Sequence, residues 1–282
     1  MQACGFYFVY LKGRNIMNIN RENVRQAFQE YIEPYDIKDV KIALKVAHTY
    51  RVAELCDAIA RGEGLSKEEQ DLAWLCGMLH DIGRFEQLRR YNTFVDAKSI
   101  DHARFGASLL FEEGLIRRFC TDSVEDELIQ AAVYWHSAYR LPENMDERTA
   151  MFANILRDAD KVDIFRVCID TPIEEIYNAT TEELKHSQVS EAVMASFYEE
   201  HATLRSLKKT VVDNIVGHIS LAYELVYPSS RKLVEEQGYL EQLMQFQSDN
   251  PVTRQQFDAV REHMHAYLRE GKVKMSKLAC DI

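Results

Sequence analysis

The sequence predicts an all-α protein, and three observations support this fold class. Only 11 of the 282 residues are glycine and 5 are proline, whereas an all-β chain needs many turns. Apolar residues recur at spacings of three and four over most of the chain, which is the helical period. Capping residues and glycines stand at the ends of these periodic stretches. A hydrophobic content of 46% and a charged content of 28% are typical of a globular protein with a core.

The first helix with a candidate functional residue is predicted between Asp36 and Arg61. Its apolar stripe consists of Val40, Leu44, Val52, Leu55 and Ile59. His48 lies in that stripe, so its ring faces the core and needs partners for its nitrogens. Gly62 and Gly64 are predicted to end this helix.

A second helix is predicted to open at Ser66 and Glu69, which form the pattern of a capping box. Its stripe leads to the dipeptide His80-Asp81, where we expect the helix to end, with Gly83 as the C-terminal stop. The pair would then lie at the end of a buried helix.

Three further helices each bring a polar residue into an apolar stripe. One begins at Asp101 and holds His102 in its first turn, and the next is predicted to be capped at Ser123 and to carry His136. The last has Asp160 midway between Leu156 and Ile164. A carboxylate in such a stripe is costly unless it is paired or coordinates a metal.

The domain organisation is predicted from a change at Pro172. Residues 17–170 are expected to form a helical core with the polar cluster, and residues 171–282 a helical C-terminal extension packed on it. Its helices are expected around 173–185, 188–227, 229–247 and 252–270, to shape the mouth of a pocket, form a homo-oligomer surface, or both. Residues 1–16 are interpreted as an N-terminal extension, with Met17 as an alternative start.

Charge and cysteine usage exclude several classes of function. The net charge of −11 disfavours nucleic acid as a partner, because an acidic surface repels phosphate backbones. Six scattered cysteines fit neither a disulfide framework nor a zinc ribbon, which suits a reducing compartment. The apolar run from Cys4 to Leu11 is too short to span a membrane and does not resemble a signal peptide. We therefore expect a cytoplasmic protein without a membrane partner.

Six polar residues together predict a metal centre: His48, His80, Asp81, His102, His136 and Asp160. Their separations let neighbouring antiparallel helices bring them to one place. A set of imidazoles and carboxylates without thiolate favours Fe, Mn, Co, Ni or Zn. Six ligands exceed the need of one open catalytic ion, so two divalent transition metals bridged by one carboxylate fit better. A hydroxide between them would be a nucleophile at neutral pH.

The ordered set His…His-Asp…His…His…Asp, with its flanks Leu79-His80-Asp81-Ile82-Gly83 and Arg157-Asp158-Ala159-Asp160-Lys161, resembles the HD-domain superfamily of metal-dependent phosphohydrolases. The resemblance covers about residues 30–170, roughly half of the chain. It implies that His48, His80, Asp81 and Asp160 are the basic metal ligands, with Asp81 as the bridge. It also implies that His102 and His136 are the added ligands of the dinuclear branches.

Charged residues near this set are candidates for other roles. Asp158 and Asp163 compete with Asp160 for the ligand role, and Asp160 is preferred because it is central to its stripe. The resemblance implies a phosphate contact for Arg84, where several branches carry lysine, and Arg104 and Lys161 could add positive charge around substrate. Asp81, Asp160, Arg84 and Lys161 are the candidate catalytic residues.

The predicted function is hydrolysis of a phosphate ester, either a nucleotide or another small phosphometabolite. The chain lacks the Gly-Tyr-Pro motif of cyclic dinucleotide phosphodiesterases and the Glu-Asp that guanosine tetraphosphate hydrolases carry after His-Asp. Two alternatives stay open. Some HD-type proteins are di-iron oxygenases that cleave polyols or phosphonates, and others are inactive nucleotide-binding regulators.

Overall fold

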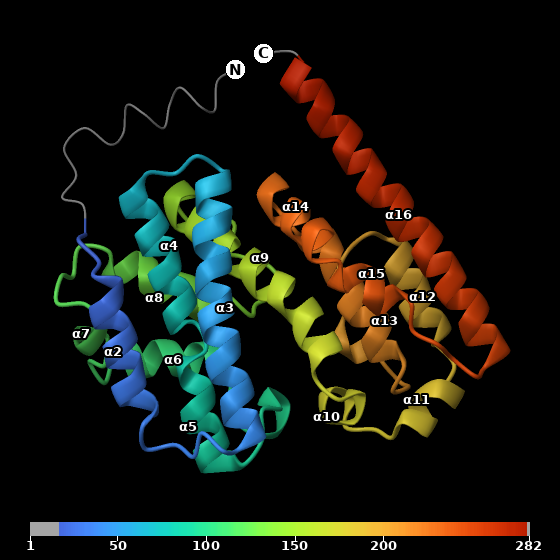
Figure 1. Cartoon of the computed structure of the whole chain (residues 1–282), viewed down its shortest axis with the longest axis horizontal. Helices are drawn as coiled ribbons and strands as arrows, with labels where there is room; N and C mark the ends of the chain where they lie inside the picture. The colour runs from blue at the N-terminus through green and yellow to red at the C-terminus, as the bar shows by residue number, and fades with distance from the viewer. Residues whose placement is uncertain (1–16, 281–282) are drawn as a thin grey trace. The chain divides into compact units, whose positions relative to one another are not determined.

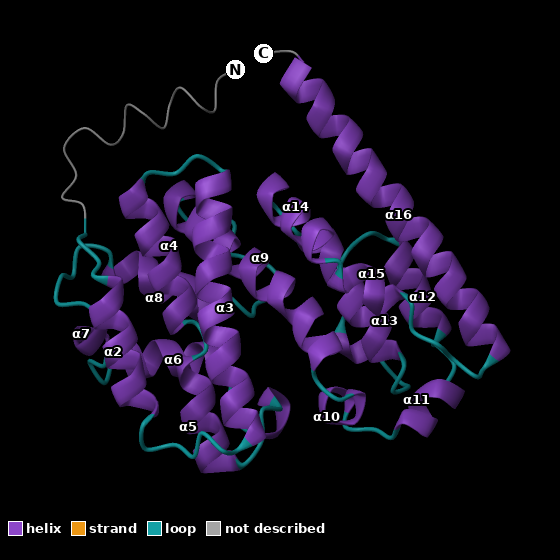
Figure 2. Ribbon diagram, in the orientation of Figure 1, coloured by secondary structure: helices purple, strands orange, loops and turns teal. Residues whose placement is uncertain are grey.

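The computed structural model describes residues 17–280, with side chains described as far as Glu270. Within these residues the chain forms helices and loops and no strand, which confirms the all-α prediction (Figure 2). Residues 1–16, interpreted above as an N-terminal extension, lie outside the described part. The chain divides into two compact units, an N-terminal unit that ends at Asp163 and a C-terminal unit that begins at Ile164. The predicted limits of 17–170 and 171–282 stay a prediction.

The N-terminal unit holds all six candidate metal ligands. Its helices, shown in blue to yellow-green in Figure 1, are α2 (Arg21–Ile32), α3 (Val40–Gly62), α4 (Lys67–Leu79), α5 (Ile82–Tyr91), α6 (His102–Phe111), α7 (Ile116–Phe119), α8 (Asp126–Trp135) and the first part of α9 (Glu147–Asp170). Aromatic and aliphatic side chains such as Trp74, Phe85 and Phe152 fill its core and are fully buried. Burial of this apolar surface is the main stabilising contribution to the unit.

The local start signals in this unit are mostly as predicted. Ser66 and Glu69 form a complete capping box at the start of α4, and Asp101 caps α6 by accepting from two main-chain amides. Gly64, with φ +77°, follows the end of α3. The predicted cap at Ser123 is wrong, because α8 begins at Asp126 after Glu125 and has no side-chain cap.

The helices α3 and α4 touch through their backbones, side by side in Figure 1. A Cβ at Gly77 would lie 2.6 Å from Ala53 Cα, so only glycine fits at this position. Because Gly77 lies one turn before His80 and Ala53 lies near His48, this contact fixes the spacing between the two imidazoles.

Gly83 is not the helix stop that the sequence predicts. The helix α4 ends at Leu79, and α5 begins at Ile82, so Gly83 lies in the first turn of a new helix. A Cβ at Gly83 would lie 2.5 Å from His102 O and 2.7 Å from Gly106 N. The glycine is therefore needed for the close approach of α5 to α6, and not for a left-handed turn.

The C-terminal unit consists of short helices and one long one. They are the last part of α9, then α10 (Ile173–Tyr177), α11 (Thr181–His186), α12 (Glu191–Tyr198), α13 (Asp213–Ile219), α14 (Pro228–Gln237), α15 (Tyr239–Met244) and α16 (Pro251–Cys280). Pro228 and Pro251 each stand at the first position of a helix, where the missing N–H costs nothing.

The predicted helical segment over 188–227 is wrong as a continuous helix, because it is divided into α12, α13 and short turns. The segment breaks between α12 and α13, where the buried Asp213 carboxylate accepts from the main-chain amides of Lys209 (2.8 Å) and Thr210 (2.9 Å). It also accepts from the amide of Ser190 (2.8 Å), which lies directly before α12. Such side-chain bonds to the backbone compete with helical hydrogen bonding. The apolar period alone does not reveal this competition.

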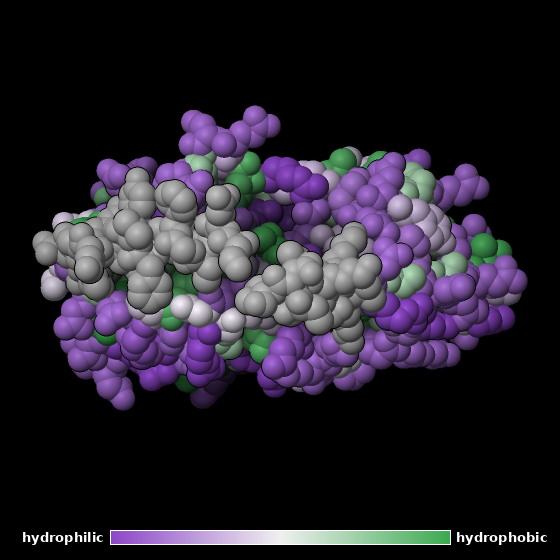
Figure 3. Space-filling view, turned by 90° about the horizontal axis from the view of Figure 1, so that it is seen from above, coloured by the Kyte–Doolittle hydropathy of each residue, from purple (hydrophilic) through white to green (hydrophobic). Residues whose placement is uncertain are grey.

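Where residues are coloured in Figure 3, hydrophilic ones predominate and hydrophobic ones form small separate groups. Among the helices of the described residues, none combines the length and the hydropathy that a membrane crossing requires.

Candidate metal centre

The six predicted ligands come together in the N-terminal unit, and all except Asp160 are almost fully buried. They are His48 in α3, His80 and Asp81 at the junction of α4 and α5, His102 at the first residue of α6, His136 directly after α8, and Asp160 in α9. Helix ends supply four of the six, because a chain that leaves a helix can turn a side chain toward a point that the helix face does not reach. Their placement is given by the structure, and their role as ligands stays a prediction.

The first half of the cluster consists of His48, His80, Asp160 and one oxygen of Asp81. The Nε2 atoms of the two imidazoles are 3.3 Å apart. Asp81 Oδ2 lies 3.6 Å from His48 Nε2 and 3.5 Å from His80 Nε2. Asp160 Oδ1 lies 3.2 Å from His48 Nε2. These donor atoms all face one small volume.

The second half consists of His102, His136 and the other oxygen of Asp81. The two Nε2 atoms are 3.1 Å apart. Asp81 Oδ1 lies 3.5 Å from His102 Nε2 and 3.8 Å from His136 Nε2. The Asp81 carboxylate therefore lies between two pairs of imidazoles, with one oxygen toward each pair.

Both halves fit a divalent metal ion. In each triad, His48–His80–Asp81 and Asp81–His102–His136, the potential ligand atoms lie within 4.8 Å of one another. Metal–nitrogen bonds of about 2.0–2.1 Å place two imidazole nitrogens of one ion roughly 3.0–3.4 Å apart. The observed nitrogen separations match that range, so the residues present could hold metal without rearrangement.

The other nitrogen of each ring is also held. His80 Nδ1 donates to Gly77 O (2.7 Å), and His136 Nδ1 donates to Val133 O (2.6 Å). A carbonyl can only accept, so these rings carry their proton on Nδ1 and present the Nε2 lone pair to the centre. This outer hydrogen bond is the usual partner of a metal-bound histidine.

Two carboxylates hold the remaining rings. His48 Nδ1 lies 2.6 Å from Asp163 Oδ2, and His102 Nδ1 lies 2.7 Å from Asp96 Oδ2. Asp163 also accepts from Arg51 Nε (2.6 Å) and Nη2 (2.8 Å). Asp163 thus lies on the far side of His48 from the centre, whereas Asp160 Oδ1 lies beside His48 Nε2, on the side that faces it.

The electrostatics of the cluster keep the carboxylates charged. Burial alone would raise the pKa of Asp81, but Lys45, His80 and Arg84 outweigh it and hold that pKa well below the usual range. Burial alone would also raise the pKa of Asp160, but the hydrogen bond with His48 outweighs burial, so that this pKa is lowered. Charged carboxylates are the form that binds cations.

The second pair of imidazoles is kept neutral. Burial, with repulsion from His102 and His80, lowers the pKa of His136 to about 3. Burial also lowers the pKa of His102, with repulsion from Arg84 in the same direction and hydrogen bonding to Asp96 opposing it. A neutral imidazole is the form that binds metal.

Among the predicted phosphate contacts, Arg84 lies at the centre. Its Nε is 3.6 Å from Asp81 Oδ1, and its Nη1 donates to Asp96 Oδ1 (2.8 Å) and Phe94 O (2.7 Å). Arg84 is thus anchored by the same Asp96 that holds His102.

The other two predicted cations are placed differently. Lys161 Nζ donates to Arg157 O (3.0 Å) on its own helix. Arg104 is 58% exposed, lies 3.5 Å from Asp101 and packs over the Tyr134 ring. No described contact joins Arg104 to the six-residue cluster, and its substrate role stays a prediction.

Lys45 is the residue that sequence reasoning missed. Its Nζ donates to Asp81 Oδ2 at 2.7 Å and lies over the Phe94 ring, which Arg84 also contacts. Lys45 stands three residues before His48, so the helical period places it on the same face. That spacing was the available signal. Asp96 opens a single 3-10 turn between α5 and α6, outside any apolar stripe, and the sequence gave no such signal for it.

Comparison with known proteins agrees with this geometry. Residues 46–165 match the family model of the HD domain, a range that includes all six clustered residues. Neither the curated proteins nor the solved structures gave a match to the chain. HD domains bind divalent metals and form a superfamily of metal-dependent phosphohydrolases. Residues 46–165 of this chain therefore belong to the HD-domain family.

Proposed function

We propose that this protein hydrolyses a phosphate ester of a small molecule, a nucleotide or another phosphometabolite, with two divalent transition-metal ions in the cluster. The observation that carries the proposal is the position of Asp81, whose two oxygens face different pairs of imidazoles. Asp81 and the two imidazole pairs would hold two ions. Ions bound there would supply an activated water at neutral pH and stabilise charge on phosphate oxygens.

The division of ligands supports two ions over one. The first half offers His48, His80, Asp160 and Asp81, and the second offers His102, His136 and Asp81. Three or four protein ligands per ion leave coordination positions open for water and substrate, as catalytic sites require. Six protein ligands on one ion would leave none.

Two cations of the protein are positioned to bind the phosphate group. Lys45 and Arg84 lie against opposite oxygens of Asp81, Lys45 at 2.7 Å from Oδ2 and Arg84 at 3.6 Å from Oδ1. Arg84 Nε is buried and has no hydrogen-bond partner among the described residues. An anion beside Asp81 would give that nitrogen a partner, and the guanidinium fork suits phosphate.

Asp160 would orient the attacking water, because its carboxylate is part of the first half and is the more exposed of the two central carboxylates. Lys161 follows it and would add positive charge near the entering substrate. We assign both residues these roles as part of the proposal.

The test is metal analysis of the purified protein followed by a panel of phosphomonoesters and phosphodiesters, including nucleotides, with Mn, Co, Fe, Ni and Zn. We expect about two ions per chain and phosphate release that needs them. Asp81→Ala should lose both metal and activity. Activity that survives this substitution would place the reaction elsewhere.

Two other outcomes would replace the proposal. Redox-active iron with oxygen uptake on a polyol or phosphonate would indicate an oxygenase. Nucleotide binding that raises the melting temperature, with no turnover under any metal, would indicate a regulator.

A further inference from the structure

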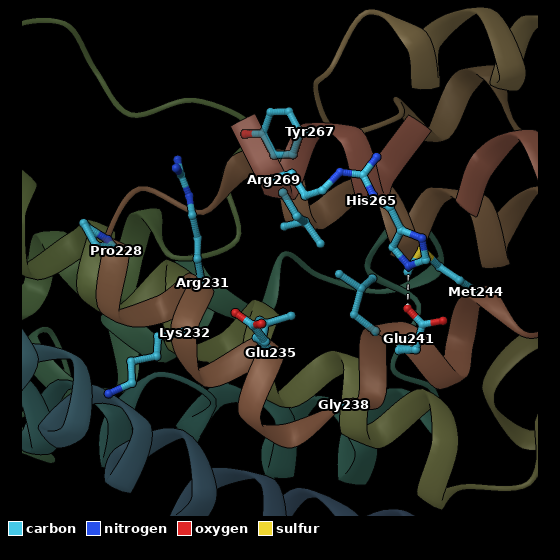
Figure 4. A pocket seen from close by; sticks show the side chains of 13 residues that line it. Pro228, Arg231, Lys232, Glu235, Gly238, Glu241, Met244, His265, Tyr267 and Arg269 are labelled. Atoms are coloured by element: carbon cyan, nitrogen blue, oxygen red, sulfur yellow. Dashed lines mark hydrogen bonds and ion pairs between the residues drawn. The ribbon is translucent and has the colours of Figure 1, made fainter. Parts of the chain in front are cut away.

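The C-terminal unit contains a cavity of about 620 Å³ between α14, α15 and α16 (Figure 4). Ligand pockets span roughly 300–1,000 Å³, so this cavity has the size of a small-molecule site. Its residues fall between Pro228 and Arg269. None of the six clustered His and Asp residues of the N-terminal unit lines it, so it is a different feature from the candidate metal centre.

The interior of the cavity is apolar. Val234, Leu240, Met244 and Leu268 line it, and the first three of these are buried. An apolar body could therefore leave water on entering it, which is the main favourable contribution to binding in such sites.

Two guanidinium groups on different helices border this apolar interior. Figure 4 shows Arg231 extending from α14 and Arg269 from α16. Arg231 Nη2 donates to Leu225 O (3.0 Å), while its Nε is buried and has no hydrogen-bond partner among the described residues. Among the side chains that the structure describes, no carboxylate pairs with either guanidinium. A buried donor without an acceptor is costly, and an anion in the cavity would relieve that cost.

The charges on the wall favour a ligand with a low negative charge. The guanidinium groups of Arg231 and Arg269 share this wall with the carboxylates of Glu235 and Glu241. Glu241 is held by His265, whose Nε2 lies 2.7 Å from Oε2. The two carboxylates would repel a phosphate dianion more strongly than a monoanion.

From these observations we propose that the cavity between α14, α15 and α16 binds a small amphipathic monocarboxylate, with its carboxylate at Arg231 and Arg269 and its apolar body on Val234, Leu240 and Leu268. The proposal concerns a second ligand site and does not depend on the reaction proposed for the metal centre.

Four probes separate the carboxylate contribution from the apolar one. Decanoate, decanol and decylammonium share one chain and differ in head-group charge, and acetate supplies the carboxylate alone. By isothermal titration calorimetry with the full-length protein, we expect decanoate to bind at least about tenfold more tightly than decanol, since charge-assisted hydrogen bonds to arginine are strong. Decylammonium and acetate should bind least.

Variants locate the binding. Arg269→Gln and Arg231→Gln should each weaken decanoate binding about tenfold and leave decanol binding unchanged. Leu268→Trp should weaken both ligands by filling the cavity. The matched control is Lys232→Gln, which removes the same charge from a side chain that is 75% exposed, lies 3.6 Å from Glu236 and points away from the cavity in Figure 4. It should change decanoate affinity less than twofold.

Three results would overturn the proposal. They are decanol binding as tightly as decanoate, Lys232→Gln weakening decanoate as much as Arg269→Gln does, and no decanoate binding at millimolar concentration. Arg269 is exposed, so its substitution is not expected to disturb folding even if that of Arg231 does. Metal content should be the same in all four variants, which keeps this test separate from that of the metal centre.

Discussion

The two units of the chain use buried polar side chains in opposite ways. In the N-terminal unit, four imidazoles are held at Nδ1 by protein groups and direct Nε2 at a common centre. In the C-terminal unit, the buried carboxylate of Asp213 accepts from three main-chain amides and from Ser190 Oγ. Its oxygens are thus used in hydrogen bonds within the protein. A polar residue in an apolar stripe therefore indicates an external ligand only when its bonds leave atoms directed at shared space.

The largest expected effect compares the two buried carboxylates. Asp81→Asn should reduce metal content and phosphate release to background, because it removes the charge that faces both imidazole pairs. Asp213→Asn should keep metal and activity but lower the melting temperature, since its carboxylate joins three segments of the C-terminal unit. Metal analysis and thermal denaturation of both variants check this. Metal loss in the Asp213 variant would remove the distinction between the units.

A smaller effect is expected where a carboxylate acts through a histidine. Asp163→Asn keeps the size of the side chain but weakens the bond to His48 Nδ1 and the ion pair with Arg51. Loss of a residue that hydrogen-bonds to a metal-binding histidine typically lowers metal affinity or activity about 10–100-fold. Titration with Co or Mn should show this loss while circular dichroism stays unchanged. Unaltered metal affinity would mean that α3 packing alone orients His48.

Glycine substitutions compare the backbone contacts of the two units. Gly83→Ala should destabilise the protein by about 1–3 kcal/mol, because the added Cβ meets main-chain atoms of His102 and Gly106 that cannot move separately. At Gly217 the added Cβ meets only the end of the Lys208 side chain, which can turn away. Gly217→Ala should therefore cost less in urea denaturation. Equal costs would show that α5 and α6 can separate.

The smallest effect is expected at Arg104. Arg104→Gln should change KM for a phosphate ester less than twofold, since this side chain is exposed and contacts Asp101 and Tyr134. Arg84→Gln, the matched change beside Asp81, should raise KM several-fold. Steady-state kinetics on both variants give the two KM values for comparison. A KM rise at Arg104 as large as that at Arg84 would support the substrate role that the sequence predicts.

The sequence predicted the all-α class and the convergence of six residues because both depend on local period. Each of the six stands in or beside an apolar stripe, and stripes meet in the core. Lys45 shared that period and could have been found. Asp96 could not, because it lies in a short 3-10 turn outside any apolar stripe, and only the fold of the segment between α5 and α6 brings it to His102.

The main errors came from contacts between segments distant in sequence. Gly83 looks like a helix stop, yet its role is the approach to Gly106. The segment 188–227 has a helical period, yet Asp213 takes the amides of Lys209 and Thr210 out of helical bonding. Local pattern gives the preferred element, and such non-local bonds decide whether it persists.

The bonds at the four Nδ1 atoms also have an entropic consequence. An imidazole that rotates freely must be ordered when it binds an ion, at a cost of roughly 0.5–1.5 kcal/mol for each side chain. Here Gly77, Val133, Asp96 and Asp163 hold the rings before any ion arrives. That cost is met during folding, so the protein's affinity for its ions is not reduced by it.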